Sequence, residues 1–239
     1  MEYGGPETFL LQTLLRFPQA PGVTGEYGNA IHASLEWYQN SIKKFDKPNI
    51  DKLIKEFDRQ IAKRYIPADR MDDFRARGHN ALNLYVASRT NMFKESAETE
   101  VDFRREGVLI GDPHLSGKID RLEVDKDAKT VKIVDFKTGK SHTKWEREVK
   151  LLKYKQQLYF YKFLIEGSHT WSGFKVLEAR LEFVEPDQNG KIVNPLNIKF
   201  NVEEEKEMKN LIQAVWARIQ NLDLPDTSNF SNDYNGSTQ

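Results

Sequence analysis

The fold is decided by the stretch Gly117-Lys-Ile-Asp-Arg-Leu-Glu-Val-Asp-Lys-Asp-Ala-Lys-Thr-Val-Lys-Ile-Val-Asp-Phe-Lys137. Its middle, Asp125-Lys-Asp-Ala-Lys129, has the composition of a tight turn, and the flanking runs are rich in β-branched residues. If the turn is centred between Asp127 and Ala128, the numbers of facing residues sum to 255. The sequence therefore predicts an antiparallel hairpin in a defined register.

This register brings compatible side chains together across the hairpin. Four pairs face each other, three apolar and one of opposite charge: Leu122–Ile133, Val124–Val131, Ile119–Phe136 and Glu123–Lys132. Such cross-strand neighbours stabilise a sheet. The same register places Asp120 opposite Asp135, and because side chains alternate, Lys137 shares the face of Asp135.

The two opposed carboxylates indicate a functional site in the hairpin. Like charges facing each other on a sheet repel, so a purely structural hairpin would avoid Asp120 beside Asp135. Carboxylates, waters and substrate phosphates are the ligands that Mg²⁺ takes. A metal there would activate water and stabilise a departing oxygen, with Lys137 orienting or polarising the attacking water. The alternative is a surface hairpin with solvated aspartates; it fits each residue alone but fits the in-register set less well.

Outside this hairpin, the spacing of apolar residues predicts helices in some segments and strands in others. Apolar residues spaced three and four apart predict helices at 27–38, 49–65, 72–93, 145–166 and 203–222. Alternation and β-branched residues predict further strands at 108–110, 177–184 and 192–200. We expect one α/β domain over residues 1–225, with a helical part at 1–95, a catalytic core at 96–225 and a disordered polar tail at 226–239.

Composition narrows the chemistry. The 239 residues include 36 Lys+Arg and 36 Asp+Glu, so the formal net charge is zero and does not indicate a charged partner such as nucleic acid. With Cys 0, disulfides, zinc–thiolate sites, iron–sulfur clusters and thiol nucleophiles are excluded. The sequence has no membrane-length apolar run or targeting segment, so a cytoplasmic protein is expected. The apolar segment 9–17 starts abruptly, and we expect the chain to begin inside a larger protein.

Several motifs together resemble the PD-(D/E)XK nucleases, specifically the RecB-like group found at the C-termini of UvrD/Rep-type helicases. The matching segments span residues 28–164 and are Gly28-Asn-Ala-Ile-His32, Gly117-Lys-Ile-Asp120, Asp135-Phe-Lys137-Thr-Gly139 and Gln157-Leu-Tyr-Phe-Tyr161. The resemblance implies a restriction-endonuclease-like core, in which a central mixed β-sheet is flanked by helices.

By resemblance, the site residues have defined roles. His32, Asp120 and Asp135 are expected to bind Mg²⁺ or Mn²⁺, helped by the backbone carbonyl of Phe136, and Lys137 is the expected catalytic lysine. Some relatives also carry a four-cysteine iron–sulfur cluster, which this chain cannot build.

Three further residues are implied by the same resemblance. Gln157 and Tyr161 are expected on the substrate side, and Glu100 is expected to support the site rather than bind the metal. Each also has a structural alternative. A lone helical histidine such as His32 is more often structural, and the four-residue spacing of Gln157 and Tyr161 equally suits core packing.

A local positive stretch adjoins the expected site. Residues 136–162 contain eight basic side chains against two acidic ones. Lys140, Lys150 and Lys153 are the expected substrate-binding residues, and three interleaved aromatic residues could stack on bases: Trp145, Tyr154 and Tyr159. A solvated helix face is the usual alternative for such a run.

These observations predict a Mg²⁺- or Mn²⁺-dependent deoxyribonuclease of the RecB-like exonuclease type. Its expected partners are DNA, more readily single-stranded than duplex, and the helicase domains of a parent protein in DNA repair or recombination. No membrane partner is expected. Two alternatives stay open: a catalytically silent module that binds DNA or docks on a helicase, and a stand-alone exonuclease of the CRISPR-adaptation type.

Overall fold

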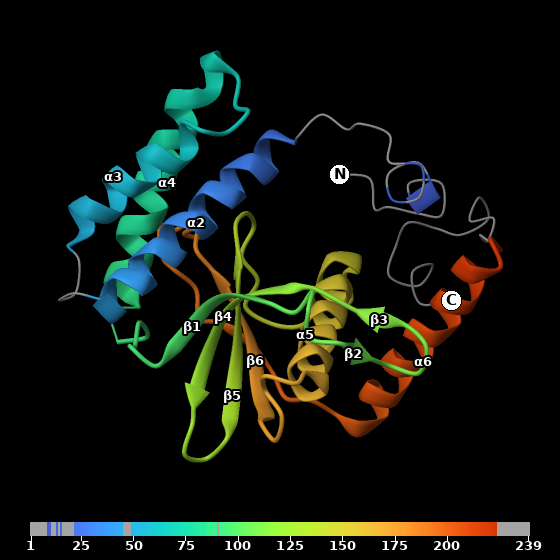
Figure 1. Cartoon of the computed structure of the whole chain (residues 1–239). Helices are drawn as coiled ribbons and strands as arrows, with labels where there is room; N and C mark the ends of the chain where they lie inside the picture. Colours follow the sequence, from blue (N-terminus) through green and yellow to red (C-terminus); the bar gives the residue numbers. More distant parts are fainter. Residues whose placement is uncertain are drawn as a thin grey trace.

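A computed structural model describes residues 9, 10, 13, 15, 22–44, 49–89 and 91–223 of the chain. From residue 22 onward, the described chain forms three helices before the central sheet, one helix between two of its strands, and one helix after its last strand (Figure 1). The expected tail at 226–239 lies outside the described residues. Among the helices that the structure describes, none combines the length and apolarity needed for a bilayer span.

The predicted N-terminal helices are confirmed, with somewhat different limits: α2 (Val23–Lys44), α3 (Ile50–Ile61) and α4 (Ala68–Ser88). The start of α3 is set by Asn49, whose side chain accepts a hydrogen bond from the backbone N–H of Lys52 at 3.0 Å. The apolar faces of these helices meet one another in a buried cluster.

The central sheet is mixed, as predicted. Its five strands lie in the order β1 (Ala97–Asp102), β4 (Lys118–Asp125), β5 (Thr130–Lys137), β6 (Lys175–Phe183) and β7 (Leu196–Ile198). Strands β5 and β6 are parallel and the other neighbours antiparallel.

The hairpin register is confirmed over most of its length. The β4–β5 ladder runs from Asp125 opposite Thr130 to Arg121 opposite Val134. Two strands were not predicted, β1 and β3 (His114–Leu115), which pairs with β2 (Val108–Leu109).

Two of the other predicted elements have different bounds. The helix expected at 145–166 is α5 (Val149–Gly167), and the strand expected at 192–200 is only β7. The closing helix is α6 (Val202–Gln220).

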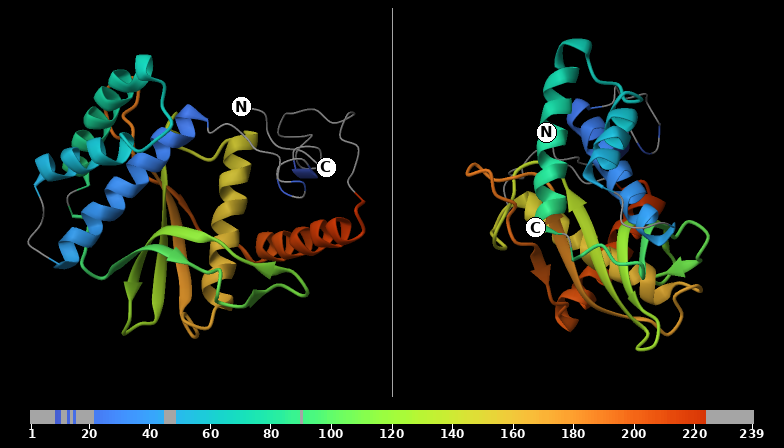
Figure 2. Two further views of the ribbon diagram at one scale, coloured as in Figure 1. Left: turned by 45° about the horizontal axis from the view of Figure 1, so that its top comes forward. Right: turned by 90° about the vertical axis from the view of Figure 1, so that its left-hand side faces the viewer.

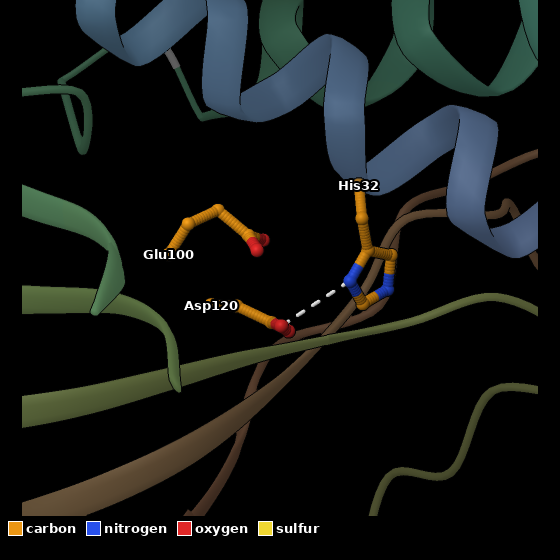
Figure 3. Close-up of side chains that lie close together, drawn as sticks. All are labelled: His32, Glu100 and Asp120. Atoms are coloured by element: carbon orange, nitrogen blue, oxygen red, sulfur yellow. Dashed lines mark ion pairs between the residues drawn. The ribbon is translucent and has the colours of Figure 1, made fainter. Parts of the chain in front are cut away.

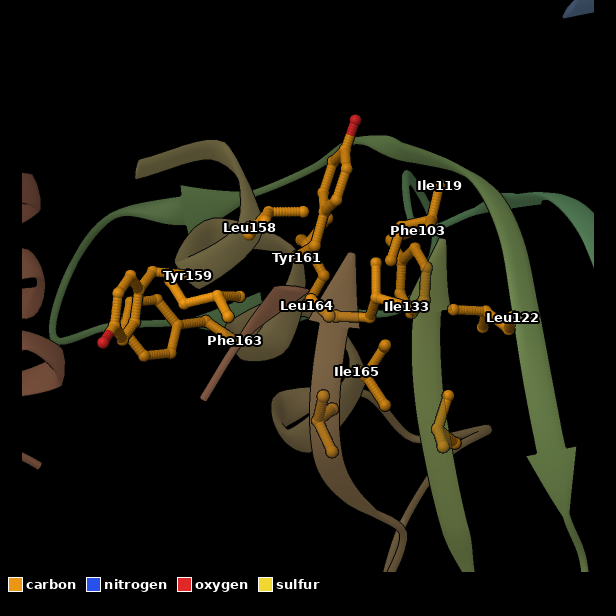
Figure 4. Packing of buried hydrophobic residues seen from close by; sticks show 14 of the residues in the cluster. Phe103, Ile119, Leu122, Ile133, Leu158, Tyr159, Tyr161, Phe163, Leu164 and Ile165 are labelled. Carbon is orange, nitrogen blue, oxygen red and sulfur yellow. The ribbon is translucent and has the colours of Figure 1, made fainter. Parts of the chain in front are cut away.

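The sheet separates two buried clusters. Helices α2–α4 cover one face and α5 covers the other, with α6 beyond α5 (Figure 2). Strand β5 contributes to both, because Val134 and Phe136 join the cluster of α2–α4 while Val131 and Ile133 join the cluster of α5. Figure 4 shows part of the second cluster, where side chains of α5 pack against β4 and β5.

Gly78 on α4 marks the tightest contact in the helical layer. A Cβ atom there would lie 2.1 Å from Cζ of the buried Phe57 ring. Alanine normally stabilises a helix interior relative to glycine, but Gly78→Ala is expected to destabilise this protein by about 1–3 kcal/mol because it overpacks a rigid ring. Thermal unfolding measures this difference.

The matched control for this prediction is Gly25→Ala on α2. No atom lies within 4 Å of a Cβ built at Gly25, so this variant is expected to keep or raise the melting temperature. Equal melting temperatures for the two variants would contradict the packing argument.

Candidate metal centre

Three carboxylates lie at one level of three neighbouring strands. In the β1–β4 ladder Thr99 pairs with Arg121 and Val101 with Ile119, which sets Glu100 level with Asp120. The end of the β4–β5 ladder, where Arg121 pairs with Val134, in turn sets Asp120 level with Asp135.

Helix α2 brings a histidine to this row. Gly28 lies one helical turn before His32, and a Cβ atom at Gly28 would lie 2.9 Å from Oγ1 of Thr138. The absence of a side chain at Gly28 therefore lets α2 approach the end of β5. From there His32 points from the helix toward the sheet (Figure 3).

His32, Glu100 and Asp120 form a group that could hold a metal ion. One potential ligand atom from each lies within 4.8 Å of the others, and His32 Nδ1 is 3.3 Å from Asp120 Oδ1. Two carboxylates suit a hard divalent cation such as Mg²⁺ or Mn²⁺, and an imidazole can complete such a ligand set. The donor set present therefore fits the divalent cation that the sequence predicts.

Glu100 adopts an unusual backbone conformation. Its φ of 52° lies in the left-handed region, which non-glycine residues rarely adopt and which tends to occur at functional sites. Its carboxylate pairs with Lys118, which offsets part of the negative charge. Glu100 was expected to support the site rather than bind the metal, and the geometry places it among the potential ligands.

Asp120 closes the hairpin with its side chain. Its Oδ2 accepts the backbone N–H of Phe136 at 2.8 Å, beyond the last backbone pair of the ladder. One carboxylate oxygen therefore fixes the strand end while the other faces His32. Metal binding by the Phe136 carbonyl stays a prediction.

Asp135 and Lys137 form a separate pair beside this group. Lys137 Nζ lies 2.6 Å from Asp135 Oδ2, and the Asp135 side chain is 2% exposed. The same Nζ donates to Gln157 Oε1 at 2.8 Å and lies 4.3 Å from the centre of the Tyr154 ring. Lys137 is thus held in place from three sides, and metal ligation by Asp135 stays a prediction.

Gln157 and Tyr161 belong to this arrangement. Gln157 Nε2 donates to the Tyr161 hydroxyl at 2.6 Å, and burial, together with the charge of Asp135, raises the pKa of that hydroxyl. The Tyr161 ring also packs in the cluster of α5, and its hydroxyl points out of that cluster (Figure 4). The four-residue spacing of Gln157 and Tyr161 was interpreted either as core packing or as a pair of site residues. Tyr161 fits both interpretations, because its ring packs in the core and its hydroxyl contacts Gln157. Contact with substrate stays a prediction for both residues.

The pKa values of Asp135 and His32 are both raised above their ordinary values. Burial raises the pKa of Asp135 to about 6, against the opposing charge of Lys137. For His32, burial lowers the pKa, but the hydrogen bond to Asp120 and its charge outweigh that effect and raise the pKa overall.

Asp135 and His32 are therefore expected to lower the thermal stability of the metal-free protein as the pH rises from about 5 to 8, whereas His142, whose pKa is lowered by burial, acts in the opposite direction. A pKa that is higher in the folded state stabilises the fold at low pH, and the contribution disappears as the pH rises through the folded pKa. For Asp135 this occurs between about pH 4 and 6, and for His32 from pH 6.5 upward. Melting temperatures in EDTA across this range measure the loss.

The control for the pH dependence is the double variant His32→Gln, Asp135→Asn. Neither replacement titrates, so the melting temperature of this variant should change much less between pH 5 and 8. The same decline in the double variant would assign the effect to other groups.

Part of the positive stretch on α5 is neutralised by ion pairs. Lys155 pairs with Glu204, and Lys162 pairs with Glu166 and, at 3.2 Å, with Glu205. The acidic residues at 204 and 205 come from the first turn of α6. The positive charges of Lys155 and Lys162 are therefore offset by neighbouring carboxylates.

The three aromatic residues that were expected to stack on bases lie in different environments. Tyr159 is 3% exposed and its hydroxyl donates to Glu204, so the prediction that it stacks on bases is wrong. The Trp145 indole N–H donates to the Asn197 carbonyl at 2.8 Å. Tyr154 is half-buried and lies beside Lys137.

The predicted substrate-binding lysines lie near this site. Lys140 and Lys153 are exposed, and Lys150 is half-buried with its Nζ 5.7 Å from the centre of the Tyr154 ring. Binding of substrate by these three lysines stays a prediction.

Comparison with known proteins gives one family match. The model of a family described as the PD-(D/E)XK nuclease superfamily matches residues 5–234. A search of curated proteins finds no match. The matched range contains the whole candidate metal centre.

Proposed function

The chain belongs to the PD-(D/E)XK nuclease superfamily, and on that premise we propose that it is a divalent-metal-dependent nuclease that hydrolyses single-stranded DNA. The observation that carries this proposal is the group of His32, Glu100 and Asp120, with potential ligand atoms within 4.8 Å. Beside it, Lys137 is held by Asp135 and Gln157. A nucleophile-orienting lysine next to a cation site suits phosphodiester hydrolysis.

In this proposal the residues of the candidate site have separate roles. His32, Glu100 and Asp120 would hold the cation, and the ion pair with Asp135 holds Lys137 in place. When bound, a divalent ion stabilises charge on phosphate oxygens and acidifies water. The Lys137 ammonium orients the attacking water toward phosphorus, and Gln157 keeps that ammonium in position through its 2.8 Å hydrogen bond.

We further propose that the chain is of the RecB-like exonuclease type and acts beside helicase domains in DNA repair or recombination. Support comes from the helical position of His32 and from the hydrogen bonds that join Tyr161 to Gln157 and Gln157 to Lys137. We also propose that residues 1–225 form one domain, because β5 contributes side chains to both buried clusters.

The test is incubation of the protein with end-labelled single-stranded and duplex DNA in Mg²⁺, Mn²⁺ or EDTA. The proposal predicts metal-dependent cleavage that is faster on the single strand. DNA binding without cleavage in either metal would overturn the proposal and favour a catalytically silent module.

A further inference from the structure

The connection between α3 and α4 reaches the metal centre from outside the sheet. A pocket of about 450 Å³ has His32, Glu100 and Asp120 in its wall, and Arg64 from this connection lines the same pocket. No motif of the sequence pointed to Arg64. The segment 62–66, Ala-Lys-Arg-Tyr-Ile, thus contributes a strong cation to a site otherwise rich in carboxylates.

Arg64 does not use its guanidinium to neutralise these carboxylates. Its Nε is buried and has no hydrogen-bond partner, and no ion pair to Arg64 occurs among the residues that the structure describes. Instead Glu100 pairs with Lys118. A buried donor without a partner is costly, and a guanidinium is the side chain best shaped to bind a phosphate through two oxygens.

Tyr65, the next residue, faces solvent. Its side chain is 78% exposed, although it is a large aromatic residue. The backbone on both sides is fixed, because Arg64 N–H donates to Ile61 O at 3.0 Å and Ile66 N–H donates to Arg64 O at 2.9 Å. Ile66 is itself buried. One exposed aromatic residue is ordinary, but here it is held next to an arginine that lines the metal pocket.

We propose that Arg64 and Tyr65 form a clamp for single-stranded DNA at the metal centre. Arg64 binds a phosphate of the strand in the pocket, and the Tyr65 ring stacks on a neighbouring base. Phosphate contact plus base stacking is how proteins bind single strands without reading their sequence. Paired and stacked bases of a duplex offer no free face to Tyr65, so the clamp selects single strands. This inference rests on the proposed nuclease function.

The test measures binding and cleavage separately. Binding of a fluorescent single-stranded oligonucleotide is measured with Mn²⁺ in a Lys137→Met background, which keeps the strand intact, and cleavage is measured without that substitution. Tyr65→Ala is expected to weaken single-strand binding roughly 5- to 100-fold, corresponding to the loss of one stacked base. Duplex binding should change by less than about twofold.

Arg64→Ala should also weaken binding and should flatten its salt dependence by about one phosphate contact. Arg64→Lys should recover only part of the affinity, because lysine lacks the planar fork. Tyr65→Phe keeps the ring and should bind as the unchanged chain does.

Arg218→Ala, an exposed arginine near the end of α6, is the matched control and should leave binding and cleavage unchanged. Melting temperatures confirm that all variants are folded. If Arg64→Ala and Tyr65→Ala bind and cleave as Arg218→Ala does, the clamp is wrong while the nuclease stands. If the unchanged chain cleaves no DNA in either metal, the proposed function itself fails, which is a different result.

Discussion

Replacing Lys137 by methionine is expected to slow DNA cleavage by about 10²- to 10⁴-fold, the usual contribution of one positioned proton-transfer or water-orienting group. Methionine keeps most of the volume but removes the ammonium that contacts Asp135 at 2.6 Å and Gln157 at 2.8 Å. His32, Glu100 and Asp120 are unchanged, so cation binding should persist. Single-turnover cleavage in Mn²⁺ measures the first effect, and the rise in melting temperature on adding Mn²⁺ measures the second.

The matched control is Lys175→Met. Lys175 is exposed and lies opposite Thr130, at the other end of the β5–β6 pair from Lys137. This variant should cleave at the rate of the unchanged chain. Cleavage by Lys137→Met at the rate of Lys175→Met would show that Lys137 takes no part in the reaction.

Asp120→Asn is expected to abolish the stabilisation by Mn²⁺ and to slow cleavage by about a thousandfold. The estimate follows because a bound metal supplies several kcal/mol of transition-state stabilisation, and each 1.36 kcal/mol is a factor of ten. The amide oxygen of asparagine can still accept the Phe136 N–H, which Asp120 accepts at 2.8 Å. In EDTA this variant should therefore be about as stable as the unchanged chain.

Asp120→Ala separates the structural role of this side chain from its chemical one. Alanine leaves the Phe136 N–H without its acceptor, which is expected to cost about 1–3 kcal/mol of stability in EDTA. Thermal unfolding of both variants, with and without Mn²⁺, makes the comparison. Normal stabilisation of Asp120→Asn by Mn²⁺ would remove Asp120 from the cation site.

The sequence was sufficient to predict the hairpin because its pattern is local. Turn residues and alternating apolar positions specify the register from Asp125–Thr130 to Arg121–Val134. Beyond that point Asp120 replaces a backbone pair with a side-chain hydrogen bond, and no propensity encodes this change.

Strand β1 was missed for a different reason. Its residues, Ala-Glu-Thr-Glu-Val-Asp, include three acidic side chains, a type that is depleted in strands, and they form a strand because β4 offers an edge to pair with. Without that strand, Glu100 could not be placed level with Asp120. The left-handed φ of Glu100 could not be predicted from the sequence either, because tertiary contacts must maintain it.

Long-range contacts explain the wrong interpretation of Tyr159. On the sequence, Tyr159 lies in a positive stretch, but the acidic start of α6 packs against that stretch in the fold. The contact joins residues 45 positions apart, and a local count of charges cannot include it.

The candidate metal centre would take its histidine from the helical layer and its carboxylates from the sheet. Affinity for the cation and attachment of α2 to the sheet are therefore reciprocal: a bound ion tightens the attachment by the same factor by which attachment raises affinity. A partner that draws α2 outward would silence the centre without contacting any of its ligands, and a rise in free cation would oppose that partner.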